Sequence, residues 1–366
     1  MPSDDLIGSL RTIALVALLD GDERCYVLDV REPDEVADWS IPGAHNVALG
    51  SLEQRVGELP RDGDIVVVCT VGGRALRGAE ILARHGLPSR VLEGGMNAWA
   101  STYDTVTGAF GGATVVQVRR RGKGCLSYVV GAAKSAVVID PSLDLDQYLD
   151  VARRQGWSIT HVLDTHLHAD HLSGARDLVA LTGATLSLNA ADPFDFDFEP
   201  LSDGRIIELS PGVALTVSAV SVPGHTEGST MYQLGECAIF TGDTLFLESV
   251  GRPDLADEAE HFAHNLHHSL HERVLPLGDD VMVFPAHYGP SVEVRAGEFV
   301  TRPLGVLRTS LPALALGERE FVEWAVRHVK DRPPNYRHIV QINAGLEPRA
   351  GQSIELELGP NRCAIA

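Results

Sequence analysis

The sequence predicts two domains in one chain: a parallel α/β sheet flanked by helices, and then a sandwich of two sheets with helices outside. The 366 residues exceed what one ordinary core accommodates, which favours two domains. In the first hundred residues, strand and helix patterns alternate at short intervals, as they do in parallel sheets. From residue 114 onward, short strands with interspersed helices indicate a sandwich.

The first part contains two buried strands and one clear helix. Residues 24–31 and 64–69 are rich in β-branched residues and are bounded by polar or glycine turns, so we expect a strand at each. Residues 75–85 have apolar side chains at helical spacing, and Gly86 fits the end of that helix. This alternation predicts the parallel sheet.

Most of the predicted strands lie in the second part of the sequence. We expect strands over 114–118, 125–131, 135–141, 159–165, 214–222, 229–234, 237–243 and 280–286, and helices over 145–155 and 175–182. Residues 104–113 are rich in Gly and Thr without periodicity, which indicates a linker. The predicted organisation is a first domain at 1–103, a linker at 104–113, a second domain at 114–303 and a C-terminal extension at 304–366 packed on the second domain.

Composition and charge exclude several classes of function. The formal net charge of -20 disfavours binding to nucleic acid or to an anionic membrane surface. The acidic start, MPSDDLIGSL, does not resemble a signal peptide, and no apolar run is long enough to span a bilayer. Five cysteines form no regular framework, so we expect a reducing, cytoplasmic setting. The oligomeric state stays open, with a homo-oligomer among the options.

Cys69 stands between a predicted strand and a predicted helix, in the sequence Val-Cys-Thr-Val-Gly-Gly-Arg-Ala. The N–H groups of the loop and of the helix start stabilise a thiolate there, and Gly72 and Gly73 let the backbone curl around it. Arg74 adds donors for an anionic substrate. A buried structural cysteine is the ordinary alternative. The glycines and arginine favour a reactive thiol, with Cys69 and Arg74 catalytic and Gly72 and Gly73 binding substrate.

This first part resembles the rhodanese family in three segments, 28–47, 66–75 and 91–99. The resemblance implies that Cys69 carries a sulfane sulfur as a persulfide. Four residues separate Cys69 from Arg74, a loop sized for sulfur, whereas related phosphatases use five. Thr70 and Ser40 stand where the family often has Arg and His, which leaves the preferred sulfur donor open.

A run of histidines, Thr-His-Leu-His-Ala-Asp-His at 165–171, is the strongest chemical signal in the chain. Histidine and carboxylate are the side chains that bind first-row metals. Further along, His225, Asp243 and His287 each follow a predicted strand. Because strand ends at one edge of a sheet converge, we expect these residues to meet at a metal.

From about residue 112 to about 300, these motifs resemble the metallo-β-lactamase superfamily, which is an αββα sandwich, and within it the persulfide dioxygenases. The resemblance implies one Fe(II) per chain, held by His166, His225 and Asp243, with open positions for substrate and O2. Arg252, in Gly-Arg-Pro-Asp, is implied to lie near the iron and bind substrate, with a structural role equally open. Four residues are implied to orient the ligands or to bind a second metal: His168, Asp170, His171 and His287.

Together the two resemblances imply oxidation of a low-molecular-weight persulfide to sulfite and thiol by O2, coupled to sulfur transfer through Cys69 with thiosulfate or sulfite. One alternative is a zinc-dependent thioester hydrolase of the hydroxyacylglutathione hydrolase type, since the full set of zinc ligands is present. Another is a non-catalytic sulfur-relay protein. Neither the thiol carrier, nor the net direction of sulfur transfer, nor the role of the extension follows from the sequence.

Other polar residues are expected to be structural. Asp29 and Arg31 fit a supporting ion pair, with a catalytic role as the less favoured alternative. Seven further histidines lack a framing carboxylate motif and are expected to be solvated or to cap helices: His261, His264, His267, His268, His271, His328 and His338.

Overall fold

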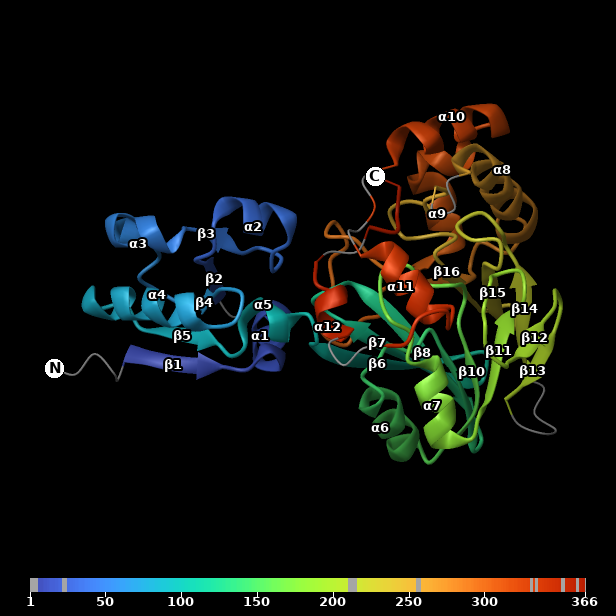
Figure 1. Ribbon diagram of the computed structural model, residues 1–366, viewed down its shortest axis with the longest axis horizontal. Helices are drawn as coiled ribbons and strands as arrows, with labels where there is room; N and C mark the ends of the chain where they lie inside the picture. Colours follow the sequence, from blue (N-terminus) through green and yellow to red (C-terminus); the bar gives the residue numbers. More distant parts are fainter. Residues whose placement is uncertain are drawn as a thin grey trace.

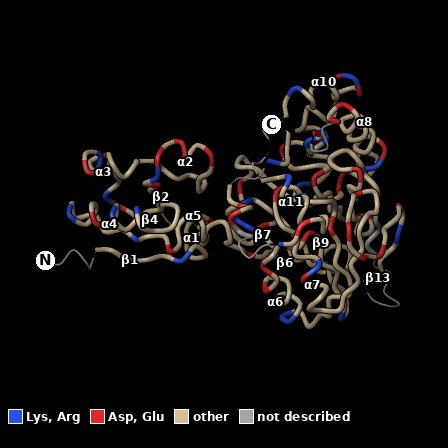
Figure 2. The backbone as a smooth tube through the Cα atoms, in the orientation of Figure 1, with Lys and Arg blue, Asp and Glu red and all other residues tan. Residues whose placement is uncertain are grey.

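The computed structural model describes residues 6–21, 25–209, 216–254, 258–329, 332, 335–349, 353–359 and 362–365. Two bodies lie side by side, the N-terminal one smaller (Figure 1). Acidic positions are spread over both (Figure 2). Within the described residues, no helix combines the length and apolar character that crossing a bilayer requires.

The first domain is a parallel sheet of five strands in the order β1-β5-β4-β2-β3, covered by helices on both faces. Its strands are β1 Ile7–Leu10, β2 Cys25–Asp29, β3 His45–Asn46, β4 Asp64–Val68 and β5 Ser89–Leu92. Its helices are α1 Thr12–Leu19, α2 Pro33–Asp38, α3 Leu49–Arg55, η2 Val56–Glu58, α4 Gly73–Arg84 and α5 Gly95–Trp99. On β4, Val67 packs with Leu82 on one face, and Val66 packs with Trp99 on the other. Both faces are therefore buried, which explains the continuous apolar run of this strand.

The second domain is a sandwich of two sheets, in the orders β12-β11-β10-β9-β8-β7-β6 and β13-β14-β15-β16-β17-β18. The first sheet has β6 Tyr103–Phe110, β7 Ala113–Arg120, β8 Cys125–Ala132, β9 Ser135–Ile139, β10 Ser158–Leu163, β11 Thr185–Asn189 and β12 Glu199–Leu201. The second has β13 Ile206–Glu208, β14 Thr216–Ser221, β15 Thr230–Leu234, β16 Ala238–Gly242, β17 Met282–Pro285 and β18 Arg302–Pro303.

Helices and a shared core close this sandwich. They are α6 Asp146–Gln155, α7 Ala175–Thr182, α8 Ala259–Ser269, η3 Leu270–Val274, α9 Leu304–Ser310, η4 Pro312–Ala315, α10 Glu318–His328, α11 Tyr336–Asn343 and α12 Ser353–Leu356. Val130 and Phe240 belong to the core between the sheets, whereas Val129 packs with Tyr148 of α6 and Leu178 of α7 on the outer face. The alternation along β8 is therefore that of a strand buried on both sides. The αββα sandwich predicted for this part is confirmed.

The expected linker at 104–113 is wrong. Residues Tyr103–Phe110 form β6, which pairs with β7 along its whole length, and Gly111 and Gly112 make the connecting turn with positive φ angles. The strand lies at the edge of its sheet, and most of its side chains are partly or fully exposed, so it lacks the apolar run by which a buried strand is recognised. Its glycine has a packing reason, since a Cβ on Gly108 would lie 2.7 Å from the Phe299 ring.

Residues after 303 are built into the second domain. Leu304, Leu307 and Phe321 belong to the core between the sheets. In α11, Ile339 and Ile342 pack against Leu172, directly after the histidine run. The C-terminal segment therefore packs against the loop that carries the candidate metal ligands.

Candidate metal centre and cysteine loop

The predicted metal-binding residues gather at one edge of the sandwich. The run at 165–171 follows β10, His225 follows β14, Asp243 follows β16 and His287 follows β17. Each histidine and aspartate among them is at most 3% exposed. Loops from both sheets thus supply donors to one buried place, as the convergence of strand ends predicted.

His166, His225 and Asp243 form the group that best fits a metal ion. Their candidate ligand atoms lie within 4.8 Å of one another. The Asp243 Oδ2 atom lies 3.6 Å from His166 Nε2 and 3.4 Å from His225 Nε2. None of these three buried atoms has a hydrogen-bond partner. Because an unpaired buried polar atom is costly, three such atoms facing one point indicate a bound cation.

The surroundings hold these three side chains in the form that binds metal. His225 Nδ1 donates to the Arg252 carbonyl at 2.9 Å, and His166 Nδ1 lies 2.9 Å from Thr165 Oγ1. Burial lowers the pKa of both imidazoles, and for His166 the neighbouring His168 lowers it further, so both rings are neutral. Burial alone would raise the pKa of Asp243, but the neighbouring His287 holds it well below its ordinary value. Neutral imidazole and ionised carboxylate are the ligand states.

His168 is not part of this group. Its Nε2 atom lies 3.2 Å from Asp140 Oδ1 and 3.7 Å from Asp164 Oδ1, and these three residues form a separate cluster. Burial opposes its protonation, but the two carboxylates raise the pKa of His168 well above its ordinary value. The structure therefore gives His168 a carboxylate-paired role beside the metal group.

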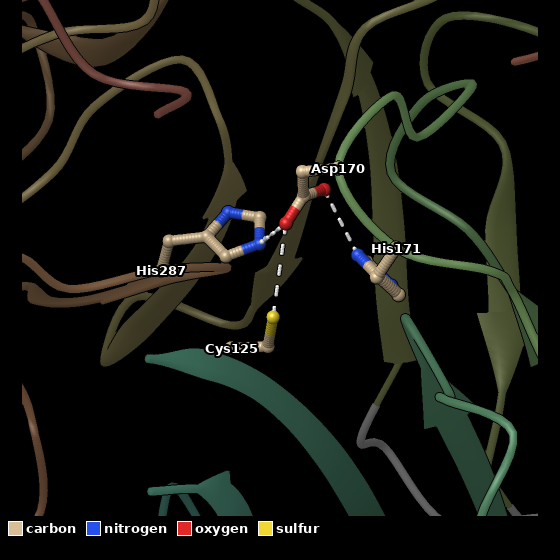
Figure 3. A group of neighbouring side chains, drawn as sticks. All are labelled: Cys125, Asp170, His171 and His287. Carbon is tan, nitrogen blue, oxygen red and sulfur yellow. Dashed lines mark hydrogen bonds and ion pairs between the residues drawn. The ribbon is translucent and has the colours of Figure 1, made fainter. Parts of the chain in front are cut away.

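A second group of donors contains Cys125, Asp170, His171 and His287 (Figure 3). Asp170 lies at its centre: Oδ2 is 2.9 Å from His287 Nε2 and 3.7 Å from Cys125 Sγ, and Oδ1 is 3.0 Å from His171 Nδ1. His287 also reaches the first group, since its Nδ1 lies 2.7 Å from Asp243 Oδ1. His287 thus stands between two carboxylates and links the two groups.

Arg252 lies behind His225 and is 1% exposed. Its guanidinium pairs with Asp254 at 2.7 and 2.9 Å and donates to the Arg362 carbonyl at 3.0 Å. Its own carbonyl accepts from His225. These contacts fit the structural role that the sequence left open beside substrate binding.

Cys69 lies at the end of β4 and is 1% exposed. Its Sγ atom accepts hydrogen bonds from the N–H of Gly72 at 3.1 Å and of Ala75 at 3.3 Å. Gly72 has a φ of +110°, a conformation that favours glycine, and Gly73 begins α4. The loop therefore wraps its N–H groups around the sulfur, as the sequence predicted.

The Arg74 guanidinium is already paired within the protein and is not open to bind an anion. Its two terminal nitrogens bind the two oxygens of Glu35 at 2.6 and 2.7 Å, and Nη2 also donates to Thr70 Oγ1 at 2.8 Å. Arg31 is likewise paired with Asp29 and donates to the Trp39 carbonyl, which is the supporting role expected of that pair.

Comparison with known proteins matches both domains. Residues 14–102 match the rhodanese-like domain, and residues 120–287 match the metallo-beta-lactamase superfamily. A persulfide dioxygenase, ETHE1, from Bos taurus is 30% identical over 206 residues, which are 54% of this chain and 74% of that protein. The crystal structure of ETHE1 from Myxococcus xanthus aligns with a TM-score of 0.56 at 26% identity, covering 63% of this chain and 97% of that one. The chain belongs to the persulfide dioxygenase family.

Hydrolases also match this chain. A hydroxyacylglutathione hydrolase from Methylobacillus flagellatus is 37% identical over 117 residues, 32% of this chain. The chain spans about half the length of that hydrolase, 46%. A persulfide dioxygenase and a hydrolase both match this chain, so similarity alone does not distinguish oxidation from hydrolysis.

Two cysteines of the site were missed from the sequence. Cys125 begins β8 and pairs in an isolated bridge with His287, and Cys363 lies within 4.8 Å of Asp243 and His287 by its ligand atom. Neither belongs to a local motif, so only pairing over a long sequence distance brings it here. The histidines expected to be structural lie elsewhere: His264 pairs with Glu318, and His268 pairs with Glu272.

Proposed function

We propose that this chain oxidises a low-molecular-weight persulfide with O2 at one ferrous ion held by His166, His225 and Asp243. In the overall reaction, one persulfide, one O2 and one water give one thiol, one sulfite and two protons. We also assign Cys69 the transfer of sulfane sulfur as a cysteine persulfide. The metal centre of the second domain gives the chain its oxidative activity, and Cys69 of the first domain supplies or withdraws sulfur.

One observation carries the proposal: three buried, unpartnered ligand atoms converge, and the Nε2 atom of His168 is paired with Asp140 and Asp164 instead. His166, His225 and Asp243 present two imidazole nitrogens and one carboxylate oxygen. This is the two-His-one-carboxylate set of non-haem Fe(II) oxygenases, which leaves coordination positions for substrate and oxygen. The residues present therefore fit iron.

When bound, the ferrous ion supplies the redox chemistry that transfers oxygen to sulfur. The chain's residues hold the donors and exclude water. His287 keeps Asp243 ionised through the 2.7 Å contact, and the Arg252 carbonyl fixes the ring of His225 so that Nε2 faces the centre. All the donors are buried, so the charge of the site is shielded from bulk water.

The zinc hydrolase alternative is supported by the hydroxyacylglutathione hydrolase match and by Asp170, His171 and His287. A hydrolase of that type binds two zinc ions and would use His168 beside His166. Here His168 faces Asp140 and Asp164 instead. That arrangement favours the single-metal dioxygenase.

The deciding experiment measures metal and reaction together. We expect anaerobically purified protein to contain about one iron per chain by mass spectrometry of metals, to consume O2 with glutathione persulfide, and to release sulfite. Hydrolysis of S-lactoylglutathione, with two zinc ions per chain, would overturn the proposal in favour of the hydrolase. Sulfur loading of Cys69 without any O2 uptake would favour the non-catalytic relay.

A further inference from the structure

Two arginines beside the Cys69 loop, Arg74 and Arg31, are each paired with a carboxylate. Arg74 is the cation of the loop, and both of its terminal nitrogens are taken up by Glu35. The other arginine beside the loop, Arg31, is buried against Asp29 at 2.7 Å. Each of these two arginines therefore has its own carboxylate.

Glu35 is ionised at neutral pH, so this pair has no net charge. The hydrogen bond from Arg74 lowers the pKa of Glu35 to about 2. Thr70 joins the pair, because its hydroxyl lies 2.8 Å from Arg74 Nη2 and donates to Glu35 Oε1 at 3.2 Å. The residue directly after the nucleophile thus secures the neutral pair and adds no cation to the loop.

Two exposed side chains near the nucleophile are apolar. Val71, two residues after Cys69, is 64% exposed, and Leu76, in the first turn of α4, is 48% exposed. The approach to the sulfur thus combines an apolar rim with a neutralised arginine.

These features discriminate between two kinds of sulfur donor. Thiosulfate carries a sulfonate directly on the sulfur to be transferred, and its oxygens need charge-assisted donors. An organic persulfide carries carbon at that place, which an apolar rim accommodates without any cation. We propose that the Cys69 loop takes sulfane sulfur from an organic persulfide in preference to thiosulfate, and that Glu35 and Thr70 set this preference. The inference rests on the sulfur transfer assigned to Cys69 above.

The transfer is balanced without an added oxidant or reductant. The Cys69 thiolate attacks the terminal sulfur of R–S–SH, a Cys69–sulfur bond forms, and the carrier's sulfur–sulfur bond breaks with its electron pair going to the carrier. The products are Cys69–S–SH and R–S⁻, which takes a proton from water. The Gly72 and Ala75 N–H groups, 3.1 and 3.3 Å from Cys69 Sγ, stabilise the negative charge on sulfur before the attack.

The test compares two small donors on the full chain without oxygen, so that no persulfide is oxidised. Thiosulfate and 2-hydroxyethyl persulfide are mixed with excess protein, and added sulfur on the Cys69 peptide is followed over time by mass spectrometry. We expect the wild-type chain to load from the persulfide at least about tenfold faster than from thiosulfate, the effect of one missing charge-assisted hydrogen bond.

Two variants at the rim should relax the preference. Glu35→Gln removes the neutralising charge while keeping an amide that can bond Arg74, and Thr70→Arg adds a cation directly after the nucleophile. Each should raise the thiosulfate rate about tenfold and change the persulfide rate less than about threefold. Glu53→Gln is the matched control, because Glu53 pairs with Arg84 on the same domain at an exposed place.

The two arms separate this inference from the proposed function. Equal loading of wild-type protein from both donors, or no effect of Thr70→Arg and Glu35→Gln on thiosulfate, would overturn the inference and leave sulfur transfer at Cys69 intact. Loading from neither donor would overturn the sulfur transfer and the inference with it. Glu35 also accepts a hydrogen bond from the Glu32 N–H at the start of α2, so Glu35→Gln could weaken this helix. Circular dichroism therefore checks that the variant is folded. Thr70→Arg leaves that hydrogen bond in place and tests the inference independently.

Discussion

At the scale of single residues, each of the three proposed ligands presents one buried atom without a hydrogen-bond partner to the other two. Replacing His166, His225 or Asp243 by Ala should each lower the iron content from about one per chain to below about a tenth, and O2 uptake should fall with it. Metal analysis and oxygen-electrode measurements on the same preparations check this. His264→Ala is the control, because that ring pairs with Glu318 at the surface. A variant that keeps its iron would remove that residue from the ligand set.

His287 should behave differently from the ligands. It contacts Asp243 from behind at 2.7 Å and Asp170 at 2.9 Å, so it orients a ligand without being required to bind the iron. We expect His287→Ala to keep most of the iron while O2 uptake at saturating persulfide falls by about 10–100-fold. Conversely, complete loss of iron in this variant would place His287 among the ligands.

At the scale of elements, the turn between β7 and β8 fastens the two domains together. Arg121 pairs with Asp20 of the first domain at 2.6 Å through both oxygens, and the Trp39 indole donates to the Gly122 carbonyl at 2.9 Å. The Arg121 and Asp20 side chains are 7% and 3% exposed. This ion pair is therefore largely removed from water, unlike an ordinary surface pair.

Arg121→Ala should loosen this junction. It leaves the Asp20 carboxylate buried without its main partner, which costs about 3–5 kcal/mol for a buried pair. We expect the first domain to unfold at a clearly lower temperature than the second, seen as a separate transition in calorimetry. Arg153→Ala, which removes an exposed pair with Asp150, should change nothing beyond about 0.5 kcal/mol. A single unshifted transition for Arg121→Ala would show that other contacts hold the domains.

The elements also show which parts of the molecule were predictable. The strands and the helices around Cys69 and the histidine run followed from apolar periodicity, and the ligands gathered because their loops all follow strands. The edge strand β6 was missed because partly exposed strands lack a buried apolar run. Glu35, Cys125 and Cys363 were missed for another reason: each reaches the site by contacts between segments far apart in the chain, and no local pattern records such contacts.

At the scale of the whole molecule, the C-terminal segment joins the surroundings of both sites. Arg362 donates to Asp38 of α2 at 2.8 Å, and the next residue, Cys363, lies beside Asp243 and His287. The same helix carries Glu35, which holds Arg74 near Cys69. In Figure 1, α12 of the C-terminal segment lies on the side of the second domain that faces the first domain. The C-terminal segment thus contacts the surroundings of both sites, although each site is built by its own domain.

This organisation predicts separable activities. The Sγ of Cys69 is held by Gly72 and Ala75, and the metal group is held by residues of the second domain, so neither site borrows a ligand from the other. Cys69→Ser should therefore oxidise a persulfide supplied in solution at a rate within about twofold of wild type, while its peptide gains no sulfur. His166→Ala should still load Cys69 from 2-hydroxyethyl persulfide and consume no O2.

The measurement is O2 uptake, sulfite release and sulfur on the Cys69 peptide for both variants, with Cys237→Ser as the control for removing a thiol away from either site. Loss of persulfide oxidation in folded Cys69→Ser protein would contradict separate sites. It would mean that sulfur reaches the metal through Cys69, and the contact of α2 with Arg362 is then the structural path along which the two domains act together.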